Sequence, residues 1–237
     1  IATAIDAIRG ACGPKVAGFA NAVLRKLSAS GEPALPLPID SRARLEIEHS
    51  LPGWVIDQLA EVLPADELAA AAAGLMAPAR LAVRVNQRKT TVAAVVAALT
   101  AEDATVTMVP GHAAALWVDG LGNPETSPSF LAGMWTVQDV GAQLVAELAQ
   151  PLAGQHILDA CAGVGGKSTH LAELANDAAT IDAADRSTTK LKLAAGSARR
   201  LGLRSLRAIV ADLAAPGDAL APAYDTVVLD APCSGLG

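Results

Sequence analysis

Hydrophobic residues recur at helical spacing in the first 30 residues of the chain. Residues 3–29 predict two helices separated at Gly13-Pro14, since proline suits the first turn of a new helix. Residues 31–38 carry three prolines and little periodic signal, which is typical of a linker, and we place it at 31–39. The second helix presents an apolar face with no neighbour in so short a segment, formed by Val16, Phe19, Val23, Leu24 and Leu27.

Within residues 40–134 the hydrophobic pattern changes from helical spacing to the alternation that is typical of strands. Asp40 or Ser41 is suited to cap a helix, and Pro52 lies near the start of another. A third helix is predicted over 66–76. The pattern then predicts a strand over 81–86, a helix over 91–100, and short strands flanking Pro110-Gly111 and 120–122. This order of elements predicts a small α+β module.

From residue 135 onward, strands and helices alternate. Residues 135–139, Trp-Thr-Val-Gln-Asp, lead into a helix over 141–149. Such alternation predicts a parallel sheet with right-handed crossovers, so the fold class is α/β with a Rossmann-like sheet. The predicted strands are 157–160, 180–184, 208–210 and 226–229, and the predicted crossover helices are 167–174 and 188–201.

Composition and charge narrow the classes of protein. The chain has 237 residues, of which 52% are hydrophobic, so it is able to bury a core. Its formal net charge of −6 argues against a broadly basic nucleic-acid binder. Cys12, Cys161 and Cys233 are too few for a disulfide framework, which favours free thiols in a reducing cytoplasm. We expect no membrane span, because no apolar run approaches about 18 residues.

A glycine-rich turn follows the first strand of the α/β region. Glycines let the backbone approach a ligand, and the next helix offers free N–H groups. The spacing is not the dinucleotide motif, because Ser168 stands where the third glycine is needed. It is not a P-loop either, because Cys161 replaces the upstream glycine. Taken alone, the glycine-rich turn is explained about equally well as a binding site for a nucleotide cofactor and as a turn that only lets the strand and helix pack together.

Carboxylates end the later strands of the predicted sheet. Asp185 follows the glycine turn by about 20 residues, where nucleoside-binding sheets keep an acid that accepts from ribose hydroxyls. Asp212 and Asp230 end the next two strands, and Asp212 is placed to accept from an adenine amino group. Asp182 competes with Asp185, but we expect it to be a partly exposed strand residue. Each acid alone fits a cap or turn, whereas the set predicts a ligand site.

The segment 230–233, Asp-Ala-Pro-Cys, brings an acid and a thiol to the end of the last strand. A buried structural cysteine is the usual alternative, but a thiol in a glycine-bordered loop at the ligand edge is placed for reaction. Methylation of carbon 5 of a pyrimidine needs such a thiol, because that carbon becomes nucleophilic only after a nucleophile adds to carbon 6. The two motifs together predict a methyl transfer site.

These motifs resemble those of the RNA cytosine-5 methyltransferases of the Sun type, which use S-adenosylmethionine. The segment 18–26 is also similar to the last helix of a NusB-like RNA-binding domain. The resemblance covers nearly the whole chain. The matching motifs are Trp-Thr-Val-Gln-Asp at 135–139, Cys-Ala-Gly-Val-Gly-Gly-Lys at 161–167, Asp185, Asp212 and Asp-Ala-Pro-Cys at 230–233.

The resemblance implies both a domain order and an activity. Residues 1–30 would end an all-α NusB-like domain, 40–134 would be an RNA-binding α+β module, and 135–237 would be the S-adenosylmethionine-binding domain, with an incomplete sheet. The activity would be methylation of carbon 5 of a cytosine in small-subunit (16S) ribosomal RNA. We expect a monomer without a metal.

The resemblance also implies a role for each matching residue. Asp185 would hold the ribose, Asp212 the adenine, and Asp230 would lie between the cofactor and the target cytosine. Gly163 and Val164 depart from the Ala-Pro usual in the family, which softens the turn. The residues implied to wrap the methionine and ribose parts of the cofactor are Cys161, Ala162, Gly163, Val164, Gly165, Gly166 and Lys167.

Cys233 has two candidate roles. In the family that the chain resembles, the attacking thiol stands in a later Thr-Cys-Ser type motif, and the thiol matching Cys233 assists product release. That later strand is missing, so we interpret the chain as a truncated fragment that does not turn over. DNA cytosine methyltransferases instead attack with a Pro-Cys thiol, which would make Cys233 the nucleophile. The surrounding residues favour the RNA family.

Two basic clusters are candidates for RNA contact. Alternation places Arg84 and Asn86 of the first on one strand face. The second cluster is better explained as a solvated surface. The clusters are Arg80, Arg84, Arg88 and Lys89, and Arg199, Arg200, Arg204 and Arg207.

Two other classes of protein stay open. A nicotinamide-dependent oxidoreductase uses a similar sheet, although Ser168 speaks against it, and a non-catalytic RNA-binding module is suggested by the NusB-like start. His49 and His170 stand outside any metal-ligand spacing, so they are interpreted as ordinary surface or helix histidines.

Overall fold

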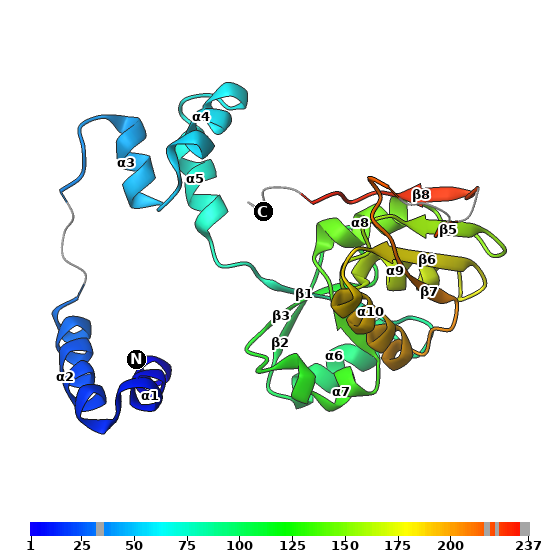
Figure 1. Cartoon of the computed structure of the whole chain (residues 1–237), viewed down its shortest axis with the longest axis horizontal. Coiled ribbons are helices and arrows are strands. Elements are labelled where there is room, and N and C mark those ends of the chain that lie inside the picture. The colour runs from blue at the N-terminus through cyan, green and yellow to red at the C-terminus, as the bar shows by residue number, and fades with distance from the viewer. Residues whose placement is uncertain (32–35, 216–218, 221–222, 233–237) are drawn as a thin grey trace. The chain divides into compact units, whose positions relative to one another are not determined.

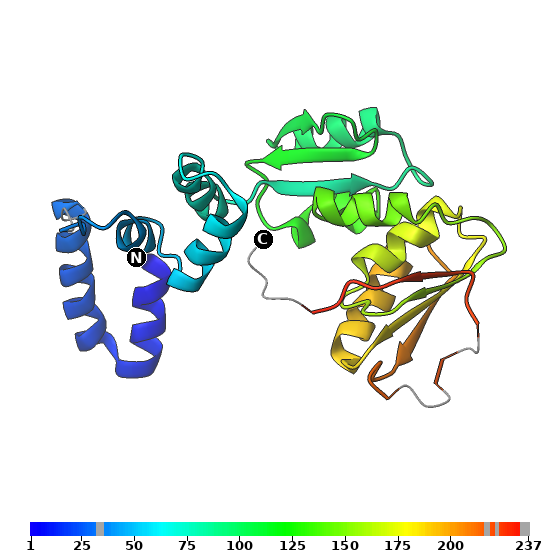
Figure 2. The same cartoon turned by 90° about the horizontal axis from the view of Figure 1, so that it is seen from above.

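The computed structural model describes residues 1–31, 36–215, 219–220 and 223–232 of the chain. The chain divides into two compact units, residues 1–77 and 78–237. Helices form the first unit, and two sheets with their helices form the second (Figures 1 and 2). Across the described ranges, none of the helices is both long enough and apolar enough to span a membrane.

The described part of the first unit is helical throughout. The predicted break at Gly13-Pro14 is confirmed, because one helix ends before Gly13 and the next begins at Pro14. Asp40 caps the third helix, its carboxylate accepting from the Ala43 N–H at 2.7 Å. The helices are α1 (Ala2–Cys12), α2 (Pro14–Ser30), α3 (Ser41–Glu48), α4 (Gly53–Val62) and α5 (Leu68–Met76).

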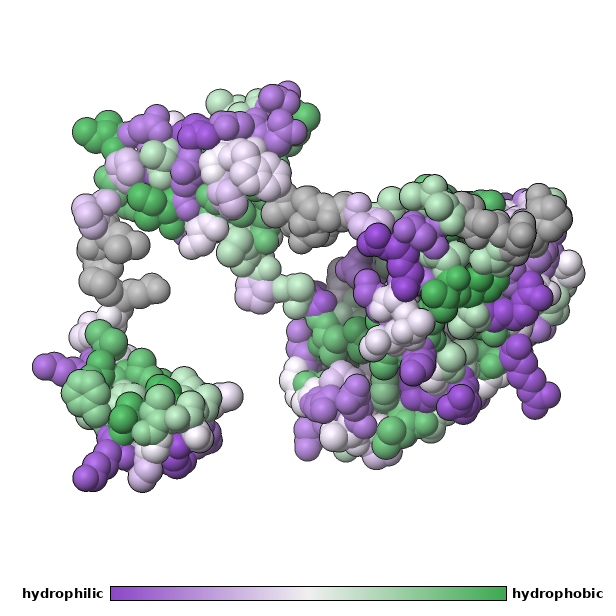
Figure 3. Space-filling view, in the orientation of Figure 1, coloured by the Kyte–Doolittle hydropathy of each residue, from purple (hydrophilic) through white to green (hydrophobic). Residues whose placement is uncertain are grey.

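The apolar face predicted for α2 is exposed. Phe19 is 72% and Leu27 59% accessible, and Val16 and Val23 are also exposed. Hydrophobic surface is visible on the α1–α2 hairpin in Figure 3. A small core lies instead among α3, α4 and α5, around Val55 and Ile56.

An antiparallel sheet opens the second unit. Its strand order is β2-β3-β1-β4, and α6 packs on it to enclose Val83, Leu99 and Trp135. Residues 135–137, which the sequence assigned to the start of the last domain, form β4 and pair with β1 of this sheet. The division of the chain into four parts stays a prediction. The elements are β1 (Leu81–Val85), α6 (Val92–Ala101), β2 (Thr105–Met108), β3 (Ala115–Asp119), a 3-10 turn (Pro124–Thr126), α7 (Pro128–Leu131) and β4 (Trp135–Val137).

A parallel sheet of order β7-β6-β5-β8 follows. Its helices α8, α9 and α10 pack on one face, where Ile157, Leu171 and Leu201 belong to one core. The predicted α/β alternation is confirmed. The elements are α8 (Val140–Leu148), β5 (His156–Asp159), α9 (Gly166–Leu174), β6 (Thr180–Asp185), α10 (Thr188–Leu201), β7 (Leu206–Val210) and β8 (Thr226–Val228).

Buried polar side chains join the two sheets of the second unit. The Asn86 amide donates to the carbonyls of Gly133 and Leu201 at 3.0 and 2.9 Å, linking β1 to the end of α10. Arg200 of α10 donates to the Trp135 carbonyl at 2.9 Å. Because hydrogen bonds fix direction as well as distance, these contacts set how the antiparallel sheet lies against the parallel one.

Candidate functional site

The candidate site begins where β5 ends at the carboxyl edge of the parallel sheet. The chain turns through the glycine-rich segment 161–166 and enters α9. Gly165 has φ +84°, and a Cβ there would lie 2.6 Å from the Ala194 Cβ in α10. Glycine is therefore required at this position both by backbone conformation and by the close approach of α10.

Asp185, at the end of β6, holds the glycine turn. Its carboxylate accepts from the Gly163 N–H at 3.0 Å and from the Ser187 N–H at 2.7 Å. A carboxylate has about four lone-pair sites, so two are left for a ligand. The Asp185 side chain thus shapes the turn and still offers acceptors to the space above it.

A cavity of about 490 Å³ opens at this edge. That volume lies in the range of small-molecule and cofactor sites. Five of the predicted site residues line it: Cys161, Gly163, Asp185, Asp212 and Asp230. The carboxylates that the sequence placed at separate strand ends are brought together here. The other lining residues are Ala160, Arg186, Lys190, Ala211, Leu213, Ala231 and Pro232.

The other predicted site residues lie beside the cavity or outside the described chain. Lys167, at the start of α9, donates to Asp230 at 2.5 Å, which brings an ammonium group to the Asp230 side of the cavity. Cys233 falls outside the described residues. Four predicted loop residues do not line the cavity: Ala162, Val164, Gly165 and Gly166.

The sequence interpretation missed Asp159, Arg186 and Lys190. Asp159 is buried at the end of β5 and accepts from the Ser168 hydroxyl at 2.5 Å, which ties the strand to α9. Burial raises the pKa of this carboxyl above its ordinary value. Asp159 has the same strand-end position as the three acids that were predicted, so the same signal identifies it.

Cys161 lines the cavity as a thiol. Partial burial raises its pKa above the ordinary value, and the neighbouring carboxylates of Asp185, Asp159 and Asp230 raise it further. Because the thiolate is the nucleophilic form, this environment disfavours Cys161 as a nucleophile. Its position fits a wall of the cavity.

Arg84, in the first basic cluster, is not available for the RNA contact that was predicted, whereas Arg80, Arg88 and Lys89 of that cluster are exposed. Arg84 is only 1% exposed, because its strand face is covered by α9, and it pairs there with Glu173 at 3.0 Å. The Lys89 ammonium donates to the Ala132 and Arg200 carbonyls. RNA contact through Arg84 is therefore wrong, while its predicted shared face with Asn86 is confirmed.

The second cluster was predicted to be a solvated surface, which is only partly correct. Arg199 and Arg204 are exposed. Arg200 is half-buried over the Phe130 ring, with its guanidinium carbon 3.6 Å from the ring centre. Arg207 is also exposed, and it pairs with Asp182 at 2.7 Å.

Asp182 was predicted to be partly exposed and is buried, because β6 lies between two strands and the side chain is enclosed by polar neighbours. It accepts from Arg207, from the Tyr224 hydroxyl at 3.0 Å, and is 2.8 Å from the His156 ring. These contacts lower its pKa despite the opposing effect of burial. Asp182 is committed to this network, whereas Asp185 faces the cavity.

His170 was interpreted as an ordinary surface or helix residue and is buried on α9, only 4% exposed. Its Nδ1 has no hydrogen bond within the described part of the chain. Burial, helped by the positive charge of Arg84, lowers the pKa of His170 to about 2. The ring of folded His170 is therefore neutral at neutral and mildly acidic pH.

The neutral His170 predicts a loss of stability in mild acid. The unfolded chain protonates this ring near its ordinary pKa of about 6.5, and the folded chain does not, so stability is lost as the pH falls below about 6.5. We expect the free energy of unfolding to drop by about 2 kcal/mol between pH 6.5 and 5 from this residue alone. Urea titrations should show a flatter pH profile for His170→Leu, and His49→Gln should keep the wild-type profile. If the free energy of unfolding falls equally steeply with pH in the wild type and in His170→Leu, His170 is not the cause of the acid sensitivity.

Two family profiles match the chain. The family described as 16S rRNA methyltransferase RsmB/F matches residues 146–237. The ferredoxin-like domain of the RsmF/B-like methyltransferases matches residues 51–123. The two matches together include most of the antiparallel sheet and the whole described part of the parallel sheet.

Curated relatives and solved structures agree with these matches. The chain is 33% identical to a probable ribosomal RNA small subunit methyltransferase B of Synechocystis, over 92% of the chain and 49% of the relative. It is 33% identical to the protein of the same name from Bacillus subtilis, over 100% of the chain and 52% of the relative. A methyltransferase homologue from Pyrococcus horikoshii superposes with a TM-score of 0.72 at 23% identity, covering 84% of this chain and 65% of that one.

The fold and the site define a Rossmann-like methyltransferase domain that follows a ferredoxin-like one. The chain belongs to the RsmB/F family of 16S rRNA methyltransferases. It spans about half the length of the curated relatives that it matches. The predicted resemblance to RNA methyltransferases is confirmed, since both relatives are named probable ribosomal RNA small subunit methyltransferase B.

Proposed function

We propose that the cavity at the carboxyl edge of the parallel sheet binds S-adenosylmethionine. The observation that carries this proposal is the convergence of Asp185, Asp212 and Asp230 with the glycine turn on one cavity of about 490 Å³. Asp185 keeps acceptor sites free for ribose hydroxyls, and Asp212 offers a carboxylate for the adenine amino group. The start of α9 lies beside the cavity rather than in its lining, and its free N–H groups suit the carboxylate of the methionine part.

Within that proposal the reaction is methylation of carbon 5 of a cytosine in small-subunit ribosomal RNA. The bound cofactor supplies an electrophilic methyl group, and the residues of the chain orient the base and handle protons. Lys167 holds Asp230 at 2.5 Å, so this carboxyl is fixed at the cavity edge where a base would enter. Cys233 follows Asp230 by three residues, and we assign it to product release.

A nicotinamide cofactor, the alternative to S-adenosylmethionine, fits the glycine turn less well. Ser168, which takes the place of the third glycine of the dinucleotide motif, is buried and donates to Asp159. In a dinucleotide site, glycine at this position lets the helix backbone pack closely on the strand. Here the Ser168 side chain fills the position and links β5 to α9 by its hydrogen bond. If the substrate is ribosomal RNA, as we propose, the protein acts in the cytoplasm.

The test is calorimetry with the 237-residue chain. We expect S-adenosylhomocysteine to bind with one site per chain, and reduced nicotinamide cofactor to give no heat beyond dilution. The reason is that Asp185 and Asp212 match the hydroxyls and the amino group of an adenosine moiety, and that the three carboxylates of the cavity repel a phosphate. Binding of the nicotinamide cofactor alone overturns the proposal.

Turnover by the same chain is a separate readout. None of its three cysteines stands in a Thr-Cys-Ser motif, so we expect no methyl incorporation into a cytosine-containing RNA. The control is Cys233→Ala in the same assay with labelled methyl donor. Incorporation by the wild-type chain that is lost in Cys233→Ala would instead make Cys233 the nucleophile.

A further inference from the structure

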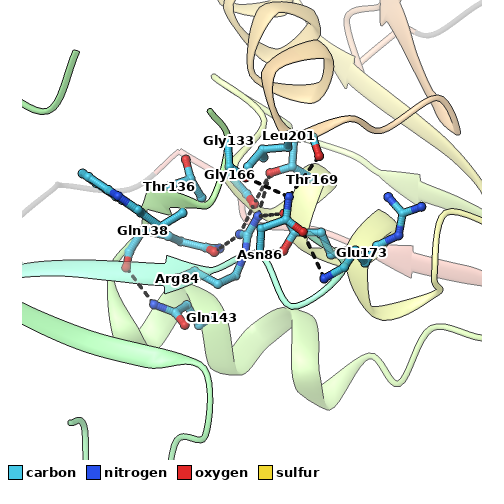
Figure 4. Close-up of polar contacts among 12 residues, drawn as sticks. Arg84, Asn86, Gly133, Thr136, Gln138, Gln143, Gly166, Thr169, Glu173 and Leu201 are labelled. Carbon is cyan, nitrogen blue, oxygen red and sulfur yellow. Dashed lines mark hydrogen bonds and ion pairs between the residues drawn. The ribbon is translucent and has the colours of Figure 1, made fainter. Parts of the chain in front are cut away.

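Arg84 lies on β1 of the antiparallel sheet, yet its guanidinium contacts the first turn of α9 (Figure 4). It donates to the Gly166 carbonyl at 3.1 Å and to the Thr169 hydroxyl at 3.2 Å. Gly166 is the first residue of α9 and the last glycine of the turn that borders the cavity. A residue of the neighbouring sheet thus holds the segment that connects the glycine turn to its helix.

Every N–H of the Arg84 guanidinium has a partner. Besides the contacts to Gly166 and Thr169, Nε and Nη2 bind the two carboxylate oxygens of Glu173 at 3.0 Å each, and Nη1 also donates to the Gln138 side chain. A guanidinium has five N–H donors in a fixed planar fork, so the five bonds leave it no freedom to rotate. The side chain is 1% exposed, so water does not compete for these bonds.

Three of the partners lie along one stripe of α9. Gly166, Thr169 and Glu173 are three and then four residues apart, which is the spacing of one helix face. An ion pair with Glu173 alone would need only two of the donors. The remaining donors reach toward the amino end of the helix, where a cation is electrostatically unfavourable for the helix itself. Helix stability therefore does not explain the contact with Gly166.

The Thr169 side chain, which accepts from Arg84, also binds the backbone of the glycine turn. Its hydroxyl lies 2.8 Å from the Gly165 carbonyl and 3.0 Å from the Gly166 carbonyl. Gly165, like Gly163, has a positive φ, and it packs directly on Ala194. Arg84 and Thr169 together therefore fix both glycines that set the direction of the α9 N–H groups.

We propose that Arg84 is a positioning residue for the cofactor site: it fixes the first turn of α9, so that the glycine turn is already in its binding conformation before the ligand arrives. The inference rests on the proposed function of the cavity. It assigns the antiparallel sheet a direct part in cofactor binding, because the residue that orders the turn belongs to that sheet. A preformed site binds more tightly because less ordering remains to be done on binding.

The same strand offers a matched control. Asn86 is also buried on β1, two residues from Arg84 and on the same face, and it also bonds to main-chain carbonyls. Its partners are the carbonyls of Gly133, just before β4, and of Leu201, the last residue of α10, and neither belongs to the glycine turn (Figure 4). Asn86→Ala therefore removes a comparable interdomain contact and leaves the first turn of α9 intact.

The experiment measures S-adenosylhomocysteine affinity and amide exchange in the folded chain. Arg84→Met and the double variant Arg84→Met/Glu173→Leu are each expected to weaken binding about tenfold, the equivalent of one lost charge-assisted hydrogen bond. The double variant leaves no unpaired buried charge, so it stays folded if the single variant does not. Arg84→Lys should recover part of the affinity. Asn86→Ala should bind within about twofold of wild type even if its melting temperature falls.

Hydrogen exchange gives a readout that needs no ligand. The amides of Thr169 and His170 should exchange faster in the Arg84 variants than in Asn86→Ala, while those of β6 (Thr180–Asp185) should change little. Loss of affinity in Asn86→Ala equal to that in the double variant would mean that affinity follows general stability, and would overturn the inference. So would wild-type binding in both Arg84→Met variants. If the wild-type chain itself does not bind S-adenosylhomocysteine, the proposed function fails, and exchange at Thr169 and His170 alone decides whether Arg84 orders the turn.

Discussion

Replacing Asp185 by Asn is expected to weaken S-adenosylhomocysteine binding by about 100-fold, the equivalent of two hydrogen bonds to a charged acceptor. The Asp185 carboxylate accepts from the Gly163 and Ser187 N–H groups, and its remaining lone pairs face the cavity. Asparagine has one acceptor oxygen and one NH₂. That NH₂ either opposes a backbone N–H, or faces a ribose hydroxyl from which it is not able to accept. The variant thus loses a contact with the ribose and at the same time weakens the hydrogen bonding that holds the glycine turn. Calorimetry on the folded variant measures the change.

Asp177 supplies the matched control for this substitution. Its carboxylate also accepts from backbone N–H groups, those of Arg204 and Ser205, at 3.0 to 3.1 Å. It lies in the loop that leads into β6, at the opposite end of that strand from Asp185. Asp177→Asn is expected to lower the melting temperature and leave the affinity unchanged. If the two variants lose affinity equally, Asp185 acts through stability, and its assignment to the ribose is wrong.

The helices of the α/β region were predictable because their end signals are local. The sequence predicted a helix over 188–201, and α10 has those bounds. Ser187 caps its start by accepting from the Lys190 N–H, and Gly202 ends it in the left-handed conformation. The strand-end acids were predictable for a similar reason, since parallel strands bring their carboxyl ends to one edge. The cavity lined by Asp185, Asp212 and Asp230 follows from that rule.

The environment of Arg84 was not predictable in the same way. Alternation placed Arg84 and Asn86 on one face of their strand, which is correct, but it does not say what covers that face. The covering groups are distant in sequence: Glu173 is 89 residues from Arg84, and Leu201 is 115 residues from Asn86. Four basic residues within 10 positions look like a surface patch until that packing is known. His170 and Asp182 were misjudged for the same reason, because burial between layers is not written in local periodicity.

The largest effect on stability is expected from breaking the buried pair between Arg84 and Glu173. Glu173→Leu leaves the guanidinium buried without its carboxylate, and we expect it to lower the free energy of unfolding by about 3–5 kcal/mol. The side chains are 1% and 7% exposed, so water is not able to replace the lost partner. The double variant Arg84→Met/Glu173→Leu should be within about 1 kcal/mol of wild type, because both charges are removed and the volume is kept. Urea unfolding of the wild type, both single variants and the double variant measures the coupling.

A surface pair next to β1 separates burial from charge pairing as the cause of this loss of stability. Arg80 and Asp119 are 2.9 Å apart with side chains about half exposed, so their pairing is screened by water. Asp119→Asn is expected to change the free energy of unfolding by less than about 1 kcal/mol. Because both arginines lie at or next to β1 and both pairs are within hydrogen-bond distance, the difference between them isolates desolvation. A loss in Glu173→Leu no larger than that in Asp119→Asn would show that the α9 face of Arg84 opens to solvent. The guanidinium would then not be rigid enough to order the glycine turn.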